Sequence, residues 1–354
     1  MNALNHTFAT LEERASFDTI IDARSESEFA EDHIPGAINC PVLNDHERVV
    51  VGTLYKQDSP FAARKVGAAL VARNVARHLE THFSDKPKSW KPLVYCWRGG
   101  QRSGSLTHIL REVGWPAKRL QGGYKTWRHF VLEQLQHVPL QFAYQVVAGP
   151  TGSAKTRVLE ALQRQGHQVL NLEGLAAHKG SVLGVLPDQP QPSKKMFETQ
   201  LLEVLRQFST QRPVFIESES RTIGKLRLPA TVFEGIQNGQ WLHIEAERAH
   251  RVAFLLSDYA YFLQGSELPQ YLDRLKELCG RERVEGWKQM AGAGHHAALV
   301  EALLTQHYDL HYQRSMRRTE AADLALRRVV AGDLSAAGIE ALAQSIAKAS
   351  ESAA

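Results

Sequence analysis

The sequence predicts an α/β protein with two domains, residues 1–138 and 139–354. The first is a parallel sheet with helices on both faces, and the second is an α/β domain with a helical C-terminal extension. Three observations predict this class: short β-type runs alternate with helical periodicity, glycine-rich loops follow two of these runs, and the last quarter is helical in pattern. With 354 residues and 43% hydrophobic composition, the chain has enough apolar material for two cores.

In the first domain, apolar runs mark the strands and helical spacing marks the segments between them. The run "FDTIIDAR" is typical of a buried strand with a polar exit. We expect strands within residues 17–24, 36–42, 92–96 and 117–123, and helices over 61–83, 103–113 and 124–135. Gly114 is expected to end the second of these helices.

The second domain begins after residues 138–141 with a strand, a glycine loop and a helix over 141–162. Further strands are expected within 167–172, 213–218 and 240–246. A proline-rich loop over 186–194 leads into a helix that extends to Phe208. Beyond Glu247 the pattern is helical almost to the end.

Composition excludes several classes of protein. No apolar run approaches the roughly 20 residues of a membrane helix, and the N-terminus lacks a signal-peptide pattern. Three cysteines, Cys40, Cys96 and Cys279, make a disulfide scaffold implausible and favour a reducing cytoplasm. The net charge of +4 and pI near 8.9 permit a nucleic-acid partner but fit an ordinary basic enzyme equally well.

The stretch "VYCWRGGQRSG" places Cys96 at the end of a strand, before a loop rich in glycine and arginine. Ligands of open parallel sheets bind at the carboxyl ends of strands. We expect the loop to turn its N–H groups inward, with Arg102 as a bidentate anion clamp and with the cysteine as a reactive thiolate. The loop is formed by Trp97, Arg98, Gly99, Gly100 and Gln101, and Ser103 starts the next helix. The alternative is a buried cysteine at a tight turn.

The segments "IDARSESEFAEDHIPGAINCPV" and "YCWRGGQRS" resemble the rhodanese family over residues 10–136. The resemblance implies a rhodanese-like fold and a cysteine that carries a persulfide or a related group. Asp22 and Arg24 would support the loop structurally. Common sulfurtransferases have four residues between cysteine and arginine, whereas five separate Cys96 from Arg102. This length resembles rhodanese-fold phosphatases and suggests a cradle for a tetrahedral, phosphate-like anion.

A second glycine loop, "AGPTGSAKT", follows an apolar strand and precedes a helix, which is the context of a P-loop. The expected phosphate- or diphosphate-binding residues are Gly149, Gly152, Ser153, Lys155 and Thr156. Ala154 replaces the second motif glycine, although alanine tolerates a positive φ poorly. Phosphate binding is expected, Ala154 argues against rapid nucleotide hydrolysis, and an ordinary strand–helix turn is the alternative.

Several polar residues are further candidates in the second domain. Glu217 and Glu219 end the strand "PVFIES" and could hold a metal or water, with Arg221 nearby, although a solvated strand end explains them equally well. The loop from His178 to Ser181 includes Lys179 and Gly180 and could contact a phosphate or RNA. Basic residues of the C-terminal half could contact RNA or simply be solvated: Arg248, Arg251, Arg274, Arg281, Arg283 and "HYQRSMRR".

The order of the two modules resembles the bacterial tRNA 2-selenouridine synthase family over nearly the whole chain. The resemblance is carried by "YCWRGGQRS", the P-loop, "EGLAAHKGSVLG" and "VFIESESRTIG". The chain departs from the family pattern at Ala154 and at Lys179, where arginine is expected.

The resemblance implies a transferase that exchanges sulfur for selenium in wobble-position 2-thiouridine of a tRNA. Geranyl diphosphate would first alkylate the sulfur, and selenophosphate would then supply selenium through Cys96 as an S-selanylcysteine. No cofactor is firmly implied, Mg²⁺ is compatible, and a selenophosphate-producing enzyme is a candidate partner. The open alternatives are a rhodanese-fold phosphatase or sulfurtransferase, and a P-loop kinase or switch with a rhodanese binding module.

Overall fold

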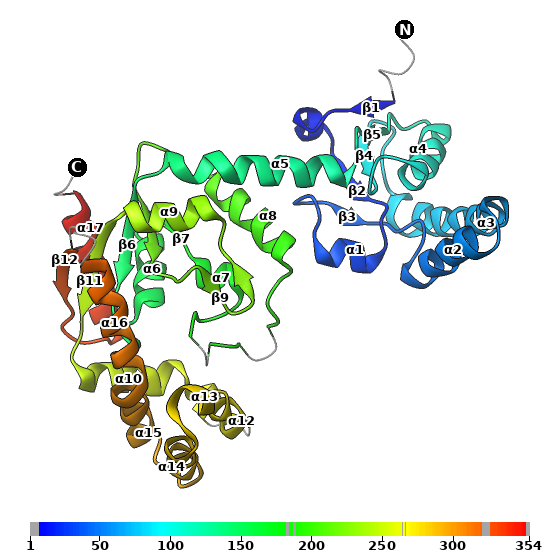
Figure 1. Cartoon of the computed structure of the whole chain (residues 1–354). Coiled ribbons are helices and arrows are strands. Elements are labelled where there is room, and N and C mark those ends of the chain that lie inside the picture. Colours follow the sequence, from blue (N-terminus) through cyan, green and yellow to red (C-terminus); the bar gives the residue numbers. More distant parts are fainter. Residues whose placement is uncertain are drawn as a thin grey trace. The chain divides into compact units, whose positions relative to one another are not determined.

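The computed structural model describes residues 7–181, 184–186, 189–263, 265, 267–320 and 326–351. Contacts divide the chain into two compact units. The first unit comprises Met1–Gln134 with Pro192–Gln200, and the second comprises Leu135–Gln191 with Leu201–Ala354. The second unit starts at Leu135, and Pro192–Gln200 belongs to the first unit although the sequence places it in the second domain. The chain can be followed in Figure 1.

Five parallel strands form the sheet of the first unit, in the order β1-β5-β4-β2-β3. All four residues of β4 are buried, as expected of a central parallel strand covered on both faces. The four strands expected from the sequence are confirmed with shorter bounds, and β1 is additional. Their bounds are β1 (Phe8–Ala9), β2 (Thr19–Asp22), β3 (Ile38–Asn39), β4 (Pro92–Tyr95) and β5 (Lys118–Leu120).

Helices connect these strands, and local capping explains where they begin. A capping box starts α2, because the Asn44 side chain accepts from the Glu47 N–H and the Glu47 carboxylate accepts from the Asn44 N–H. The three expected helices are confirmed, whereas α1 and α2 are additional. Gly114, at φ +107°, ends α4 as predicted. The bounds are η1 (Glu12–Ser16), α1 (Glu26–Glu31), α2 (Asp45–Gln57), α3 (Pro60–His78), the π-helical turn η2 (Leu79–Phe83), α4 (Gln101–Val113) and α5 (Tyr124–His137).

The sheet of the second unit is also five-stranded and parallel, in the order β12-β11-β6-β8-β7. The prediction of helix nearly throughout the C-terminal segment is wrong at β12, because the β-branched run "LRRVV" pairs in parallel with β11 at the sheet edge. The bounds are β6 (Tyr144–Ala148), β7 (Gln168–Leu170), β8 (Val214–Glu217), β11 (Gln240–Glu245) and β12 (Leu326–Val330); β9 (Thr222–Ile223) and β10 (Leu226–Arg227) form an antiparallel pair.

Among the described residues, two apolar cores stabilise the second unit. One lies between the sheet and the helices α6 and α17, and the other joins the helices α10 to α15 without any strand. The helices are η3 (Val138–Gln141), α6 (Lys155–Arg164), α7 (Leu172–Ala176), α8 (Lys194–Leu205), α9 (Ala230–Asn238), α10 (Arg248–Asp258), α11 (Ala260–Leu263), α12 (Leu268–Asp273), α13 (Lys276–Cys279), α14 (Arg281–Gly292), α15 (His296–Leu303), η4 (Leu304–Tyr308), α16 (Asp309–Glu320) and α17 (Ala336–Glu351).

The start of α8 belongs to the first unit, which the sequence does not signal. Lys195 lies 2.8 Å from the Glu31 carboxylate, and Glu198 forms an ion pair with Arg128. The end of α8 instead buries Leu201 and Leu205 within the second unit. Among the described residues, no helix combines the length and apolar character that crossing a bilayer requires.

Candidate functional sites

Cys96 lies directly after β4, where the sheet ends, and is 3% exposed. Its Sγ lies 3.1 Å from the Oγ of Ser103. Ser103 is in the first turn of α4. This helix begins at Gln101, two residues before the predicted start at Ser103. The fold therefore brings Cys96 and the start of a helix together, in the geometry expected from the sequence. A hydroxyl beside the thiol can donate a hydrogen bond to a thiolate.

Glycines shape the loop that follows. Gly99 has a φ of +67°, and Gly123 has a φ of +64°. A Cβ at Gly123 would collide with the Cys96 carbonyl and the Gly99 nitrogen, so a side chain there would displace the loop. The N–H of Tyr124 donates to the Cys96 carbonyl at 2.8 Å. In sequence, the Gly-Gly pair before Tyr124 indicates only the return strand, and its support of the cysteine loop is visible only in the structure.

The outer residues of the loop face solvent. Arg98, Gly100 and Gln101 are exposed. Trp97 is 36% exposed, and its ring centroid lies 5.4 Å from that of Tyr124. These residues are available to a ligand or to a macromolecular substrate, whereas the thiol behind them is shielded.

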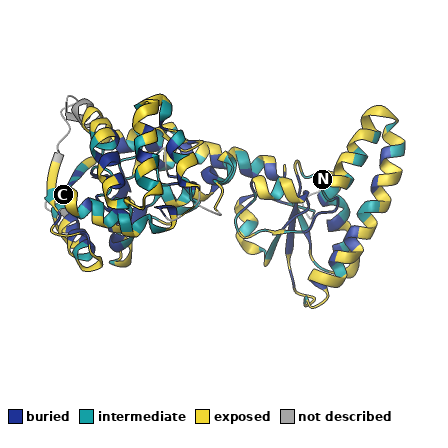
Figure 2. Ribbon diagram, turned by 90° about the horizontal axis from the view of Figure 1, so that it is seen from below, coloured by how far each residue is buried: buried dark blue, intermediate teal, exposed yellow. Residues whose placement is uncertain are grey.

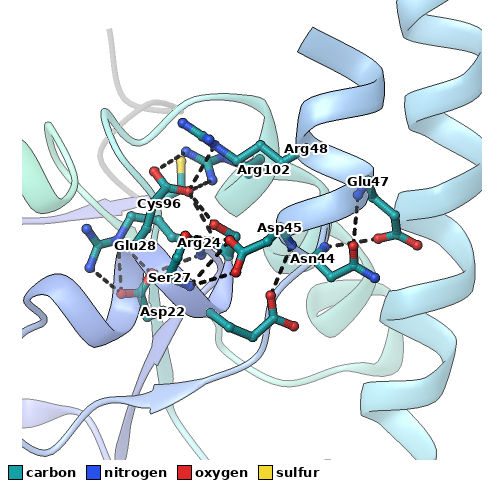
Figure 3. A network of polar contacts seen from close by, with 12 residues as sticks. Asp22, Arg24, Ser27, Glu28, Asn44, Asp45, Glu47, Arg48, Cys96 and Arg102 are labelled. Carbon is teal, nitrogen blue, oxygen red and sulfur yellow. Dashed lines mark hydrogen bonds and ion pairs between the residues drawn. The ribbon is translucent and has the colours of Figure 1, made fainter. Parts of the chain in front are cut away.

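Arg102 is engaged by an acidic partner. Its Nη1 and Nη2 donate to the two carboxylate oxygens of Glu28 at 2.5 and 3.2 Å. Arg48 lies 3.2 Å from the same carboxylate (Figure 3). Burial alone would raise the Glu28 pKa, but the hydrogen bonds and charge of Arg102, together with Arg48, hold it below its ordinary value. The two donors used leave further guanidinium N–H groups for an anion.

Asp22 and Arg24 form a buried pair at the end of β2. The Arg24 Nη2 lies 2.6 Å from Asp22 and also donates to the Asp32 carbonyl at 2.6 Å. The guanidinium lies 3.9 Å from the ring centroid of Tyr124. Neither side chain is accessible to a substrate. These contacts favour the structural role expected for the pair.

The second glycine loop joins β6 to α6. Gly152 has a φ of +83°, and Ala154 adopts the left-handed conformation at φ +58° and ψ +25°. The alanine thus takes the backbone geometry that normally favours glycine, at a cost of roughly 1–2 kcal/mol. A Cβ at Gly149 would lie 2.5 Å from the Ser153 Oγ and 3.2 Å from the Ile244 carbonyl, so a side chain there would displace Ser153.

This loop lines a cavity of about 610 Å³ in the second unit. The predicted residues Gly149, Gly152, Ser153, Lys155 and Thr156 all line it, as do Lys179, Ser181 and Glu219. The Lys155 Nζ donates to the Gly149 carbonyl at 2.9 Å. Burial lowers the Lys155 pKa despite nearby carboxylates. The phosphate loop and its candidate neighbours therefore form one site.

Three carboxylates surround the lysine. Thr156 donates to Glu173 at 2.7 Å, and Glu217 accepts from the Glu173 N–H at 2.8 Å. Burial raises the pKa of Glu217 to about 8 and that of Glu219 to about 7, and the Glu173 charge adds to both shifts. Glu217 is buried rather than solvated, and its Oε2 has no hydrogen-bond partner among the described residues. The sequence does not single out Glu173, because its contacts with Thr156 and Glu217 come from other elements.

Lys179 contacts the cavity wall. It lies 2.5 Å from an Asp258 carboxylate oxygen and 3.9 Å from the ring centroid of Tyr259. Asp258 also pairs with Arg157 at 2.8 Å. His178 lines the same cavity and is buried. This part of the cavity therefore combines a charged network with aromatic surface.

Two basic residues differ from expectation. Arg221 lies 5.3 Å from the ring centroid of Phe233 and is not among the residues that line the cavity. Arg251, a candidate RNA contact, is 5% exposed and pairs with Asp309 at 2.5 Å. It also donates to the Thr151 carbonyl at 2.9 Å. The RNA-contact interpretation is wrong for Arg251, because its charge is neutralised inside the protein and its geometry supports the phosphate loop.

An apolar chamber of about 60 Å³ lies beside the large cavity. Five residues line both spaces: Thr151, Ser181, Leu255, Tyr259 and Tyr308. The remaining lining is apolar and comes from the helical core: Phe262, Leu263, Leu268, Val300, Leu303 and Leu304. A phosphate loop next to such a chamber suits a ligand with a charged head and a hydrocarbon tail.

Comparisons with known proteins match the N-terminal and the central part of the chain to two different domain families. Residues 7–130 match the rhodanese-like domain family, and residues 142–290 match the tRNA 2-selenouridine synthase AAA domain family. A tRNA 2-selenouridine synthase of Shewanella halifaxensis is 33% identical over 85% of this chain and 82% of that protein. The chain belongs to the tRNA 2-selenouridine synthase family.

Other members of the tRNA 2-selenouridine synthase family show similar agreement. The Alcanivorax borkumensis protein is 32% identical over 84% of this chain and 90% of its own length. The Nitrosomonas europaea protein is 37% identical over 68% of this chain, and the matched region spans 63% of that protein. The chain thus matches less than two thirds of the length of this relative.

Proposed function

We propose that this protein is a cytoplasmic, tRNA-modifying transferase that replaces sulfur by selenium in wobble-position 2-thiouridine. Selenophosphate would supply the selenium, and geranyl diphosphate would activate the sulfur. Family membership supports the tRNA-selenating activity. The division of labour between a thiol loop and a phosphate loop is our interpretation of the two sites.

The observation that carries the geranyl step is the apolar chamber beside the phosphate loop. A diphosphate would contact Lys155 and the N–H groups of the loop, since positive charge and helix N-termini favour phosphate. The hydrocarbon chain would lie toward Leu255 and Tyr308, which line both spaces. A nucleotide base would leave its polar edge unpaired against this surface, at a cost in binding.

In the first step, the thiouridine sulfur would bond to the first carbon of the geranyl chain while the carbon–oxygen bond breaks. The diphosphate would leave with the bonding electrons, and Lys155 would stabilise its charge. In the second step, selenium would bond to the uridine carbon and the geranyl thiolate would leave. Selenium enters and sulfur leaves at the same oxidation state, and water accepts the phosphoryl group of selenophosphate, so the overall exchange needs no oxidant.

Cys96 is the proposed selenium carrier, and Arg102 with the surrounding loop is the proposed anion site. The outer selenium of an S-selanylcysteine is two electrons more oxidised than the selenium of selenophosphate, so loading Cys96 takes a two-electron oxidant such as a disulfide. A thiol returns the two electrons when the selenium passes to the uridine carbon, and the net exchange stays redox-neutral. The side chains of Arg98 and Gln101 are exposed, and the backbone of Gly99 and Gly100 would form the cradle. Trp97 and Ser103 complete the loop. A tetrahedral selenophosphate would be held by the charge-assisted donors that Glu28 leaves free on Arg102.

A magnesium ion fits the carboxylates beside the phosphate loop. The Glu173 carboxylate and the Thr156 hydroxyl, which lie 2.7 Å apart and both line the cavity, offer the oxygen ligands that Mg²⁺ prefers. Glu217, whose Oε2 has no partner among the described residues, accepts from the Glu173 N–H. When bound, Mg²⁺ would neutralise the charge of a leaving diphosphate. A second proposed partner is the enzyme that produces selenophosphate. A direct contact with it would limit the loss of selenophosphate to solvent.

The test is reconstitution with 2-thiouridine tRNA, geranyl diphosphate and selenophosphate, with tRNA nucleosides analysed by mass spectrometry. The complete mixture should yield 2-selenouridine, and omission of selenophosphate should leave S-geranyl-2-thiouridine. Selenouridine formed at an undiminished rate without geranyl diphosphate would exclude the geranyl step. Failure to modify tRNA under any condition would exclude the proposed function.

A further inference from the structure

The helices α2 and α3 form a hairpin, residues 45–78, that has no part in the function proposed above. α2 contains no buried residue. The first half of α3 buries only Ala63 and Gly67, and Gly67 lies against Val51 of α2. Figure 1 shows the two helices side by side, and Figure 2 shows exposed residues along much of both. With thirteen residues, α2 is about 20 Å long, so the hairpin offers an extended surface.

The charge on this hairpin has one predominant sign. Residues 45–78 contain six Lys or Arg residues and three acidic residues, and two of the three, Asp45 and Glu47, lie in the first turn of α2 at the base of the hairpin. Lys56, Arg64, Lys65 and Arg73 are exposed. Among the described residues, none forms an ion pair with these four. Ordinary solvated helices usually mix both signs along one face, so this surface is complementary to a polyanion.

Large apolar side chains lie among these charges. Tyr55 is 59% exposed, Phe61 is 67% exposed and Val49 is 61% exposed. Lys65 lies 5.3 Å from the ring centroid of Phe61. Aromatic rings between basic side chains are typical of surfaces that bind single-stranded or looped RNA, where rings stack on bases and cations contact phosphates.

The base of the hairpin adjoins the cysteine loop. Arg48, in the first turns of α2, lies 3.2 Å from the Glu28 carboxylate. The same carboxylate accepts from Arg102 at 2.5 Å (Figure 3). A strand of RNA bound along the hairpin would therefore lead toward the loop that contains Cys96.

We propose that the α2–α3 hairpin binds the sugar–phosphate backbone of the tRNA substrate, with Tyr55 and Phe61 contacting unstacked bases. This inference rests on the proposed function for the identity of the RNA. RNA is favoured over a protein partner because Lys56, Arg64, Lys65 and Arg73 form no ion pair with the described residues and an RNA supplies negative charge at every nucleotide.

The test compares the full-length protein with two double variants, Arg64→Ala/Lys65→Ala and Tyr55→Ala/Phe61→Ala. Lys88→Ala/Lys91→Ala, which removes two exposed lysines outside the hairpin, is the matched control. Binding of 2-thiouridine tRNA is measured by fluorescence anisotropy at several salt concentrations. The basic double variant should bind about tenfold more weakly, with a salt dependence reduced by close to two phosphate contacts. The aromatic variant should weaken binding without changing the salt dependence.

Circular dichroism and thermal unfolding must first show that each variant folds. The inference would be overturned if both hairpin variants bound tRNA with the wild-type affinity. It would also be overturned if the lysine control lost as much tRNA affinity as the hairpin variants. If the hairpin variants lose the binding of a protein but keep the wild-type affinity for tRNA, the hairpin is a protein-binding surface. That result would also overturn the inference. Absence of tRNA binding by the wild-type protein would instead contradict the proposed function.

Discussion

The Arg102 guanidinium is anchored by Glu28, with donor–acceptor distances of 2.5 and 3.2 Å to its two carboxylate oxygens. Glu28 is the third residue of α1 and accepts from the N–H of Ser25, so the capping box of this helix also positions the arginine. One carboxylate thereby links a helix start, the cysteine loop and, through Arg48, the base of the α2–α3 hairpin.

Glu28→Ala should raise the KM for selenophosphate by about tenfold, with a smaller effect on kcat. Without its anchor, Arg102 samples several rotamers, and ordering it on the anion costs roughly 1–2 kcal/mol. Steady-state selenation of S-geranyl tRNA gives both constants. Glu80→Ala, at an exposed position of the same unit, should leave them unchanged. A lower KM in Glu28→Ala would mean that Glu28 competes with the anion instead of positioning Arg102.

Cys96→Ser should reduce selenation to background and leave geranylation within about twofold of wild type, because a serine hydroxyl is a poor nucleophile near neutral pH. Cys279→Ser removes another thiol and should be near wild type. Mass spectrometry of trapped wild-type protein should show the isotope envelope of selenium on Cys96. A phosphoryl group on Cys96 would contradict the carrier role and favour phosphatase-type chemistry, which the five-residue spacing also permits. Equal loss of both steps in Cys96→Ser would contradict the division of labour.

The sequence predicts the parts of each site that are contiguous in the chain. The cysteine loop follows from Cys96 and its glycines, and the phosphate loop follows from Gly149 to Thr156, because strand, loop and helix are adjacent. The sequence does not predict the side chains that contact these loops from distant positions in the chain. Glu28 is 74 residues from Arg102, and Glu173 is 17 residues from Thr156. Only the sheet topology brings such residues together.

Burial also could not be predicted from residue type alone. Arg251 is of a kind that contacts RNA, yet Asp309 and the Thr151 carbonyl bind it inside the protein. Glu217 resembles a solvated strand end in sequence, yet it is 1% exposed. The short edge strand β12 follows a long helical region, and its pairing with β11 depends on a non-local contact that local periodicity does not contain.

The apolar chamber predicts separate effects on the two parts of geranyl diphosphate. Lys155→Ala should weaken binding of inorganic diphosphate by about tenfold to a hundredfold, because it removes a charge-assisted contact. Val300→Phe enlarges a residue that lines the chamber and should raise the KM for geranyl diphosphate while diphosphate affinity stays unchanged. Overpacking costs about 1–3 kcal/mol of stability, so folding is checked by thermal unfolding. Leu310→Phe, at a 46% exposed site outside the chamber, is the control.

An unchanged KM for geranyl diphosphate in a folded Val300→Phe protein would exclude the chamber as the site of the chain. Titration calorimetry with diphosphate alone and with geranyl diphosphate separates the two contributions. Tight ATP or GTP binding that is lost in Lys155→Ala would instead favour a nucleotide-dependent role for the phosphate loop.

The buried carboxylates predict a stability that declines with rising pH. In the folded protein the Glu217 pKa is about 8 and the Glu219 pKa is about 7, because burial and neighbouring charge disfavour ionisation. In the unfolded chain a glutamate has a pKa near 4.3. Between these values the folded state binds more protons than the unfolded state, so the free energy of unfolding decreases as pH rises. The stabilisation that comes from the two protonated carboxyl groups is fully present below about pH 4.3 and is lost as pH rises through 7–8.

Glu217→Gln should flatten this pH dependence, because an amide keeps the uncharged form at every pH. We expect the ligand-free variant to exceed wild type in stability by on the order of 2 kcal/mol or more near pH 9, and we expect the difference to be smallest at the acid end of the range, near pH 5. Denaturant unfolding followed by near-UV circular dichroism from pH 5 to 9 measures the difference. Glu301→Gln, at an exposed position, should retain the wild-type slope. Parallel pH profiles for wild type and Glu217→Gln would show that Glu217 ionises normally in the folded protein.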